Sequence, residues 1–332
     1  MKKLIGFICL SLFLVMVTGC SSQQDASKTK NGKQKVSIML DWYPNAVHSA
    51  IYTAKEKGYF SKEGLDVDIQ MPAETNDPLK LVAAGKVDLA ISYQPQVIVS
   101  RADGIPVVSL AALVRHPLDY LMVPKNSSIR RPKDLEGKNI GYSSIDIEQA
   151  ILNTMIQTDG GNPKKVKMTD VGFDLIPAIS SHKVDGIIGG YINHERILLE
   201  KEGHPVRAFN PAQYGVPDYY ELVLVASEKG LHEKKNVYKK FWKAVAKGQS
   251  DVTKNPEAGL KILLDHENDT FPLDPKVETK SLNILLPLMN SQNKPFGYQD
   301  ERVWENVNHW LYKNGVIKEK IDVKKAFYNI HS

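Results

Sequence analysis

Cysteine is almost absent from this 332-residue chain, which contains only Cys9 and Cys20. The segment after residue 20 therefore has no thiol, so it can form no disulfide bond, bind no metal through a thiolate and use no cysteine nucleophile. We expect neither a metal nor a cofactor in this protein. The two cysteines that are present fall within the first twenty residues, where they belong to a separate pattern.

Charge of a single sign and long apolar runs are also lacking. The 43 Lys and Arg residues oppose 38 Asp and Glu residues, and basic residues alternate with acidic ones apart from pairs such as Lys164-Lys165. Without a basic stripe, the sequence predicts a solvated surface and no nucleic-acid partner. The apolar run at 4–17 falls short of the roughly 20 residues that a membrane-spanning helix needs, so we expect no such helix.

Residues 1–19 have the pattern of a secretory signal. Lys2 and Lys3 precede the apolar run, and small residues precede Cys20 as a cleavage site requires. The ending Val-Thr-Gly-Cys resembles a bacterial lipobox, whose cysteine is acylated and becomes the first residue of the mature protein. The alternative is an ordinary secretory peptide with a chance cysteine. Residues 20–35 are mostly polar and predict a flexible tether. Together these features predict a lipoprotein anchored through Cys20 to the extracytoplasmic face of the cell membrane.

The rest of the chain alternates between strand-like and helix-like apolar periodicity. This alternation is typical of an α/β fold with parallel strands. The expected strands lie at 36–40, 65–71, 89–92, 139–142, 166–171, 184–189 and 220–227, and the expected helices at 46–57, 77–84, 147–157, 173–181 and 195–202. From residue 238 onward the pattern is mostly helical, with Trp242, Trp304 and Trp310 expected in the core.

The order of these segments predicts two lobes. Residues 36–124 would form the first part of lobe 1, residues 125–219 lobe 2, and residues 220–332 the return to lobe 1. Two α/β lobes joined by two crossing strands imply a cleft that closes on a ligand by hinge motion. The alternative is two independently packed domains without a functional groove. We expect a monomer.

Several motifs in this segment resemble a known family. They are the Leu-Asp-Trp-Tyr-Pro-Asn stretch at 40–45, Gly-Tyr-Phe at 58–60, Glu-Gly-Leu at 63–65, Gly-Lys-Val-Asp-Leu-Ala-Ile at 85–91 and Asp-Leu-Glu-Gly-Lys at 134–138. The chain resembles the NMT1/THI5-like group of solute-binding proteins. More narrowly, it is similar to members that deliver N-formyl-4-amino-5-aminomethyl-2-methylpyrimidine, a thiamine precursor, to an ABC importer. The resemblance implies a periplasmic-binding-protein-like (type II) two-lobe fold, with an ABC permease and its ATPase as partners.

Three aromatic residues follow strands at equivalent ends of the expected sheets: Trp42, Tyr93 and Tyr191. Loops at the carboxyl ends of parallel strands form the crevice in folds of this kind. A flat aminopyrimidine offers two π faces, and each aromatic pair adds about 0.5–1.5 kcal/mol beyond area burial. Ordinary core packing explains each aromatic residue taken alone. Their shared position, with the family resemblance, favours ligand contact for Trp42 and Tyr93 and leaves both readings open for Tyr191.

Two carboxylates are candidate acceptors for the amine of such a ligand. Glu195 begins a helix four residues after Tyr191, and a hydrogen bond from an amine to a carboxylate contributes about 1.5–3 kcal/mol. Compensation of the helix dipole is the alternative role of Glu195. Asp41 is either a ligand acceptor or a turn-stabilising residue beside Pro44. Asn193 is expected to cap the helix rather than to contact the ligand.

The loop at 141–146 runs from a strand into a helix. Related sulfonate and nitrate binders hold an anion at such a helix N-terminus. Asp146 and Glu148 in the first turn would repel one here. We expect Ser143 and Ser144 to donate hydrogen bonds to the formamide tail of the ligand instead.

Two other functions are compatible with the resemblance. The same superfamily contains pyrimidine synthases that consume one of their own histidines, and His48 lies in the shared motif. Those enzymes resemble one another in a cysteine-rich iron-binding motif that this chain lacks. The other possibility is a binding protein with a different cargo, such as riboflavin, hydroxymethylpyrimidine, a sulfonate or nitrate.

Overall fold

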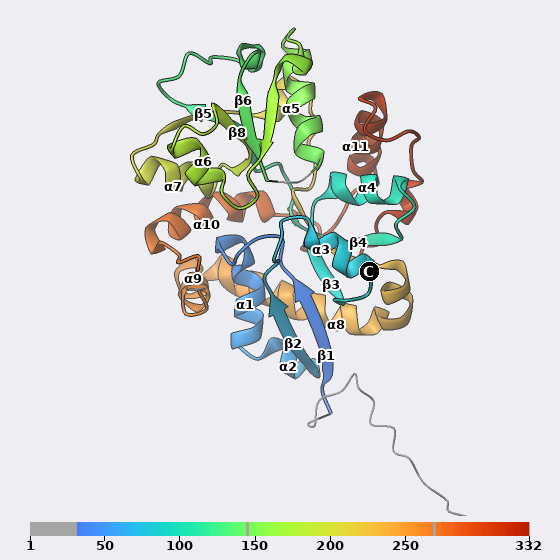
Figure 1. The fold of residues 1–332 in the computed structure, drawn as a ribbon. Helices are drawn as coiled ribbons and strands as arrows, with labels where there is room; N and C mark the ends of the chain where they lie inside the picture. Colours follow the sequence, from blue (N-terminus) through green and yellow to red (C-terminus); the bar gives the residue numbers. More distant parts are fainter. Residues whose placement is uncertain (1–31, 144–145, 268–269, 332) are drawn as a thin grey trace, which may run out of the picture.

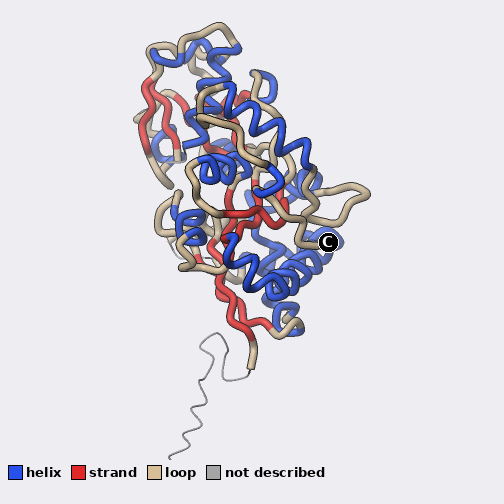
Figure 2. The backbone as a smooth tube through the Cα atoms, turned by 90° about the vertical axis from the view of Figure 1, so that its right-hand side faces the viewer, coloured by secondary structure: helices blue, strands red, loops and turns tan. Residues whose placement is uncertain are grey.

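The computed structural model describes residues 32–143, 146–267 and 270–331. The predicted signal at 1–19, the lipidation residue Cys20, most of the tether and Ser144 lie outside the described residues. The described chain forms two five-stranded sheets with helices packed on them (Figure 1). In Figure 2 the strands form two groups along the long axis of the molecule. We call each sheet, with the helices packed on it, a lobe.

The first sheet has the strand order β2-β1-β3-β10-β4. β1 runs parallel to β2 and β3, and β10 runs antiparallel to β3 and β4. All residues of β3 and β4 are buried, as expected for strands covered on both faces. The strands are β1 (Gln34–Met39), β2 (Leu65–Gln70), β3 (Leu89–Ser92), β4 (Val107–Val114) and β10 (Leu222–Ser227).

The second sheet repeats this pattern with the order β7-β6-β8-β5-β9. β6 is parallel to β7 and β8, whereas β5 is antiparallel to β8 and β9. The α/β two-lobe prediction is confirmed, but both sheets are mixed rather than parallel because one strand in each returns in the opposite direction. The strands are β5 (Asp119–Pro124), β6 (Asn139–Tyr142), β7 (Lys167–Asp170), β8 (Gly186–Tyr191) and β9 (Val206–Phe209).

Helices cover both sheets. The first lobe carries α1 (Ser49–Glu56), α2 (Tyr59–Lys62), α3 (Asp77–Ala83), α4 (Gln94–Ala102), α8 (Glu228–Lys254), α9 (Pro256–Leu264), α10 (Pro275–Met289) and α11 (Glu301–Lys313). The second lobe carries α5 (Asp146–Thr158), α6 (Leu175–Ser180) and α7 (Glu195–Lys201). Short 3-10 turns include η1 (Ala46–His48), η2 (Pro132–Leu135), η3 (Pro163–Lys165), η4 (Pro211–Tyr214) and η5 (Val323–Lys325).

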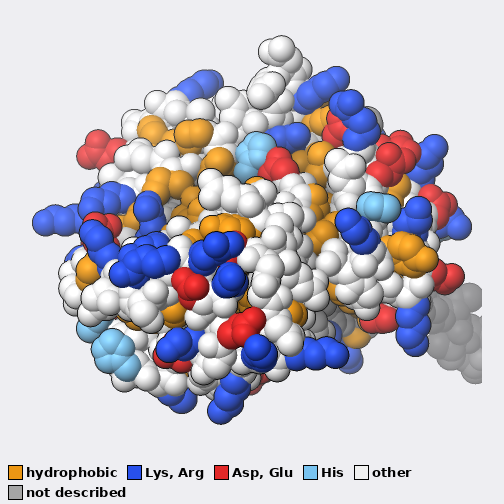
Figure 3. Space-filling model, turned by 90° about the horizontal axis from the view of Figure 1, so that it is seen from above, with side chains coloured by type: hydrophobic (Ala, Val, Ile, Leu, Met, Phe, Trp, Pro, Cys, Tyr) orange, Lys and Arg blue, Asp and Glu red, His pale blue; other side chains and the backbone are white. Residues whose placement is uncertain are grey.

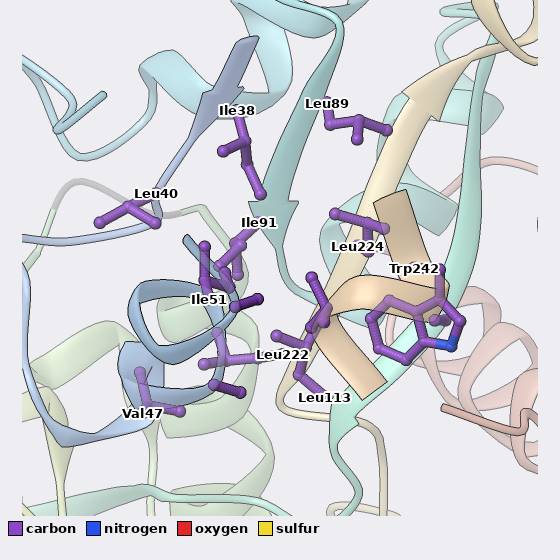
Figure 4. Close-up of a cluster of buried hydrophobic side chains, with 14 of the residues drawn as sticks. Ile38, Leu40, Val47, Ile51, Leu89, Ile91, Leu113, Leu222, Leu224 and Trp242 are labelled. Atoms are coloured by element: carbon purple, nitrogen blue, oxygen red, sulfur yellow. The ribbon is translucent and has the colours of Figure 1, made fainter. Parts of the chain in front are cut away.

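A large apolar cluster joins the first sheet to its helices. Ile38, Leu89 and Leu224 project from neighbouring strands toward α1 and α8, and Trp242 of α8 closes one side (Figure 4). Trp242, Trp304 and Trp310 are 2%, 0% and 6% exposed, which confirms their prediction as core residues. This packing fixes the strand ends that point toward the second lobe.

The chain crosses between the sheets twice. The first crossing segment is residues 115–118, between β4 and β5, and the second is residues 210–221, between β9 and β10. The predicted lobe boundary at 124 comes too late, because β5 already pairs with β8 and β9. β4 and β5 form one nearly continuous apolar stretch, so the crossing at Arg115-His116-Pro117 gave little signal. The helix α4 and the strand β9 were also not predicted.

Among the described residues, no helix is both long and apolar enough to span a membrane. On the face seen in Figure 3, Lys and Arg side chains are interspersed with Asp and Glu side chains. No stripe of a single charge crosses that face, in line with the mixed charge pattern of the sequence.

Candidate functional site

A cavity lies between the two lobes. It has about 570 Å³ of empty space, which includes the part open to solvent. Six of the seven predicted ligand residues line it: Asp41, Trp42, Tyr93, Ser143, Tyr191 and Glu195. The seventh, Ser144, lies outside the described residues. Strand and helix ends of both lobes and the crossing segments supply the other wall residues, which are Asn45, Pro95, Asp119, Ile147, Glu148, Ile151, Gly189, His194, Tyr219 and Glu221.

Aromatic side chains form much of the wall. Trp42 follows β1 in the first lobe and contacts Phe173 of the second lobe, with ring centroids 4.5 Å apart. Tyr93 directly follows β3, and Tyr191 is the last residue of β8. Burial, together with nearby carboxylates, raises the pKa of both tyrosines well above the ordinary value, so both remain neutral phenols. The aromatic residues thus offer flat, uncharged surfaces from both lobes.

Asp41 is held by a buried histidine. The Asn45 backbone N–H donates to His48 Nδ1 at 3.2 Å, which leaves His48 Nε2 as the donor to Asp41 Oδ1 at 2.9 Å. His48 is fully buried and does not line the cavity. Asn45 also begins η1, where its side chain accepts from the Val47 N–H. His48 therefore orients the Asp41 carboxylate in the loop after β1.

Two carboxyl groups sit where the chain crosses between the lobes. Glu221 Oε2 accepts from the backbone N–H of Leu118 at 2.5 Å and of Asp119 at 3.0 Å, which ties the two crossing segments together. Asp119 Oδ1 accepts from the Gly189 N–H at 2.7 Å. Burial raises the pKa of Glu221 to about 7 and, with the neighbouring Glu221 carboxylate, raises the pKa of Asp119 well above its ordinary value.

Glu148, in the first turn of α5, accepts hydrogen bonds from the loop that precedes the helix. Its Oε2 accepts from the Ser143 N–H at 2.7 Å, and the Ser143 hydroxyl donates to its Oε1. Ser143 therefore differs from the prediction: both of its donors serve Glu148, and none is left for a formamide tail. The Ser143 carbonyl accepts from the Thr75 hydroxyl of the first lobe, so this loop also joins the lobes.

The side chain of Glu148 lies directly against the backbone of β8. Gly189 has a φ of +95°, and a Cβ there would lie 2.7 Å from Cδ of Glu148. Only glycine combines this backbone conformation with so close an approach. Gly189 thus permits the close approach of the Glu148 carboxyl group to β8 at the cavity wall.

Glu195 is positioned by its own turn and by His194. Its Oε2 accepts from the Tyr191 N–H at 2.8 Å, and its Oε1 lies 2.9 Å from His194 Nδ1. Burial alone would raise the pKa of Glu195, but the adjacent His194 and these hydrogen bonds lower it, so the group is ionised. Asn193 does not cap α7 as predicted: its Nδ2 donates to Ser281 Oγ on α10, and His194 occupies the N-cap position.

Four other residues of the cavity wall were not predicted from the sequence: Asp119, His194, Tyr219 and Glu221. Tyr219 and Glu221 stand directly before the apolar β10, and Asp119 begins the apolar β5. A buried acid at the edge of an apolar strand is a usable signal, since such a charge is costly unless it serves a purpose. His194 adjoins the predicted Glu195 and could have been found with it.

The fold and the cavity define a class of protein. Two sheets crossed twice by the chain, with a cavity between them, match solved structures of the periplasmic binding protein fold. One is a Candida albicans protein described as having the generic periplasmic binding protein fold (TM-score 0.68, 17% identity, 90% of this chain and 96% of that one). Another is the alkanesulfonate-binding protein SsuA of Xanthomonas axonopodis (TM-score 0.71, 14% identity, 89% and 98%).

Within that class, the chain belongs to the NMT1/THI5-like family, whose model matches residues 45–259. It is 42% identical to the formylaminopyrimidine-binding protein of Halalkalibacterium halodurans, over 98% of this chain and 99% of that protein. It is 26% identical to the 4-amino-5-hydroxymethyl-2-methylpyrimidine phosphate synthase of Legionella pneumophila, over 90% and 92%. Among the described residues, no group of three or more His, Cys, Asp or Glu side chains is arranged to hold a metal ion.

Proposed function

We propose that this protein is the extracytoplasmic solute-binding lipoprotein of an ABC importer and captures N-formyl-4-amino-5-aminomethyl-2-methylpyrimidine for thiamine biosynthesis. The observation that carries the proposal is the composition of the cavity, in which aromatic side chains stand beside five carboxyl groups. The relative from H. halodurans, named for formylaminopyrimidine binding, supports the same ligand.

The hydrogen-bonding groups of the cavity indicate the ligand class. Asp41, Asp119, Glu148, Glu195 and Glu221 are each 5% exposed or less. None of the described residues that line the cavity is Lys or Arg. Carboxyl oxygens with no Lys or Arg beside them favour a ligand that brings N–H donors over an anion, which has only acceptors to offer. An aminopyrimidine has such donors, whereas sulfonate and nitrate do not.

Each wall has a role in this binding mode. Trp42, Tyr93 and Tyr191 would contact the faces of the pyrimidine ring. Glu195 is ionised and would accept from the exocyclic amine, and Asp41, fixed by its histidine, would accept from a second donor. The roles of these residues follow from their positions around the cavity and remain predictions.

The enzyme alternative is less well supported by the same cavity. A pyrimidine phosphate synthase must accommodate a phosphate group, and a wall of carboxyl groups without Lys or Arg offers few donors to hold one. His48, the residue that kept this alternative open, is fully buried against Asp41 outside the cavity. We therefore propose binding rather than catalysis.

Titration calorimetry tests the ligand. The full chain, purified in detergent, should release heat with the formylated aminopyrimidine and none with taurine or nitrate. Riboflavin and hydroxymethylpyrimidine serve as the remaining competitors. A protein that gives no heat with the pyrimidine at millimolar concentration, or that binds taurine more tightly, would refute the proposed ligand.

Membrane attachment is tested separately. If Cys20 is acylated, the chain should incorporate labelled palmitate and fractionate with the membrane. Cys20→Ser should abolish the labelling and leave the protein unanchored. Labelling that persists in Cys20→Ser would contradict the proposed anchor without affecting the proposed ligand.

A further inference from the structure

His194 lies where the two lobes meet at the edge of the cavity. It stands between β8 and α7 of the second lobe and is 4% exposed. Its Nδ1 lies 2.9 Å from Glu195 Oε1, and its Nε2 lies 3.1 Å from Glu278 Oε1. Glu278 belongs to α10, which packs on η1, α9 and β4 of the first lobe as well as on α7 (Figure 1). One imidazole ring thus contacts carboxyl groups of both lobes.

The two contacts of the ring favour its charged form. An ionised carboxylate can only accept hydrogen bonds, so two such partners require a proton on each ring nitrogen. The raised pKa of His194 agrees with an imidazolium that contacts both carboxyl groups and neutralises part of the charge of Glu195. Charge-assisted hydrogen bonds of this kind are about twice as strong as neutral ones.

The chain of contacts continues into the opposite wall of the cavity. The second oxygen of Glu278, Oε2, accepts from the Ala46 N–H at 2.7 Å. Ala46 directly follows the loop that carries Asp41 and Trp42. A further hydrogen bond, from Asn193 Nδ2 to Ser281 Oγ at 2.9 Å, joins the segment before α7 to α10. These contacts connect the wall of one lobe to the wall of the other and bury polar groups that opening would expose to water.

We propose that Glu195, His194 and Glu278 form a latch that holds the lobes together over the cavity and keeps Glu195 oriented toward the ligand. His194 is a positioning residue in this arrangement: it acts on the ligand through Glu195. The latch deepens the proposed function, because it explains how closure and recognition of an amine involve the same carboxylate. The identity of the ligand rests on the proposed function, whereas the contact between the lobes does not.

The latch should depend on pH. The titratable groups that face His194 are Glu195 on α7, Glu278 on α10 and Tyr43 in the loop after β1. Burial alone would lower the pKa of His194, but these neighbours raise it well above its ordinary value. A histidine with a raised pKa contributes fully at low pH and loses its contribution as the pH rises through that value. The latch is therefore closed at neutral pH and should open in alkaline solution.

Two variants and a matched control test the latch. His194→Gln removes the charge and one of the two bonds, and Glu278→Gln keeps the shape of its side chain while removing its charge. His266→Gln is the control, because His266 pairs with Glu56 at 3.4 Å within the first lobe and outside the cavity. Circular dichroism establishes that each variant is folded.

Two readouts separate the latch from the ligand. Calorimetry gives the affinity for the formylated aminopyrimidine from about pH 6 to pH 10. Electron–electron double resonance gives the distance between lobes in the absence of ligand, from spin labels at Lys240→Cys on α8 and Lys164→Cys on η3. These labels are selective because the chain has no cysteine after Cys20. If both latch variants fail to fold, the distance in the otherwise wild-type protein is followed against pH.

We expect His194→Gln and Glu278→Gln each to lose tenfold or more in affinity, to lengthen the distance between lobes and to flatten the pH profile. The double variant should be no worse than either single variant, because both remove one interaction. Wild-type affinity, distances and pH profile in both variants would overturn the latch and leave the proposed function standing. If the wild type does not bind the pyrimidine, the proposed function fails. The distance between the lobes then tests the latch alone. A distance that is unchanged in both variants, or that stays constant across the pH range, refutes the latch.

Discussion

Replacing Gly189 by alanine should destabilise the protein and weaken binding through one identifiable contact. The residue has a φ of +95°, and a left-handed conformation costs an L-residue roughly 1–2 kcal/mol. The new methyl would also lie 2.7 Å from Cδ of Glu148. Burial, together with Asp119, raises the pKa of Glu148 well above its ordinary value. The carboxyl group can move away only by breaking its two hydrogen bonds with Ser143, each worth about 0.5–1.5 kcal/mol.

Gly64→Ala is the matched control for this substitution. Gly64 has a φ of +76°, and a Cβ there would meet no atom within 4 Å. It therefore carries the backbone strain without the contact. Urea unfolding followed by circular dichroism should show Gly64→Ala destabilised by about 1–2 kcal/mol and Gly189→Ala by about 2–5 kcal/mol. Only Gly189→Ala should also lose affinity for the pyrimidine, since only that change displaces a carboxyl group of the cavity.

A third variant isolates the contact further. In Gly189→Ala with Glu148→Ala, the methyl has room, so the double variant should be more stable than the sum of the two single effects predicts. Equal stability of Gly189→Ala and Gly64→Ala, or strict additivity with Glu148→Ala, would refute the reasoning. Either result would mean that Glu148 can move from Gly189 without loss.

Three further predictions concern the cavity. Trp42→Ala should cost about tenfold or more in affinity by calorimetry, because it removes an aromatic wall, and unchanged affinity would exclude Trp42 from the site. Glu195→Gln should cost about 1.5–3 kcal/mol of binding free energy, roughly 10- to 150-fold, with the exposed Asp170→Asn as a neutral control. The buried Glu221 has its pKa raised from 4.5 to about 7, so the folded state holds its proton longer and stability falls as the pH rises through that interval. Glu221→Gln should reduce this loss of unfolding free energy between pH 4.5 and pH 7 by roughly 3 kcal/mol, as measured by urea unfolding. The same dependence of stability on pH in the variant and the wild type would contradict this prediction.

The sequence was sufficient for most of the fold. The strands at 89–92 and 139–142 have the bounds that the apolar runs predicted, since short buried strands flanked by polar residues leave a sharp pattern. The direction and sheet of β5 could not be read in this way. It follows β4 after only residues 115–118, and only the pairing with β8 and β9 assigns it to the second sheet.

The residues of the candidate site also differ in how well the sequence predicts them. Trp42, Tyr93 and Tyr191 were predictable because each lies at or just after the end of a strand, and strand ends gather at one edge of a sheet. Asp119 and Glu221 meet only because the chain crosses twice between the lobes and brings distant segments together. The partner of His194 is 84 residues away on α10. Such contacts depend on the order of the strands and the packing of the helices, which local periodicity does not contain.

The cavity combines many carboxyl groups with rigid positioning of their oxygens. Each of its five carboxyl groups has at least one oxygen held by the protein: Asp41 by His48, Asp119 by the Gly189 N–H, Glu148 by Ser143, Glu195 by the Tyr191 N–H, and Glu221 by two backbone N–H groups. Most of these donors belong to the backbone, so the acceptors are oriented by the fold before a ligand arrives. Acceptors fixed in advance lose little entropy on binding and cannot rearrange to accommodate an anion. Selectivity for a flat, amine-bearing ring would then come from the arrangement of the strand ends and crossing segments as much as from any single side chain.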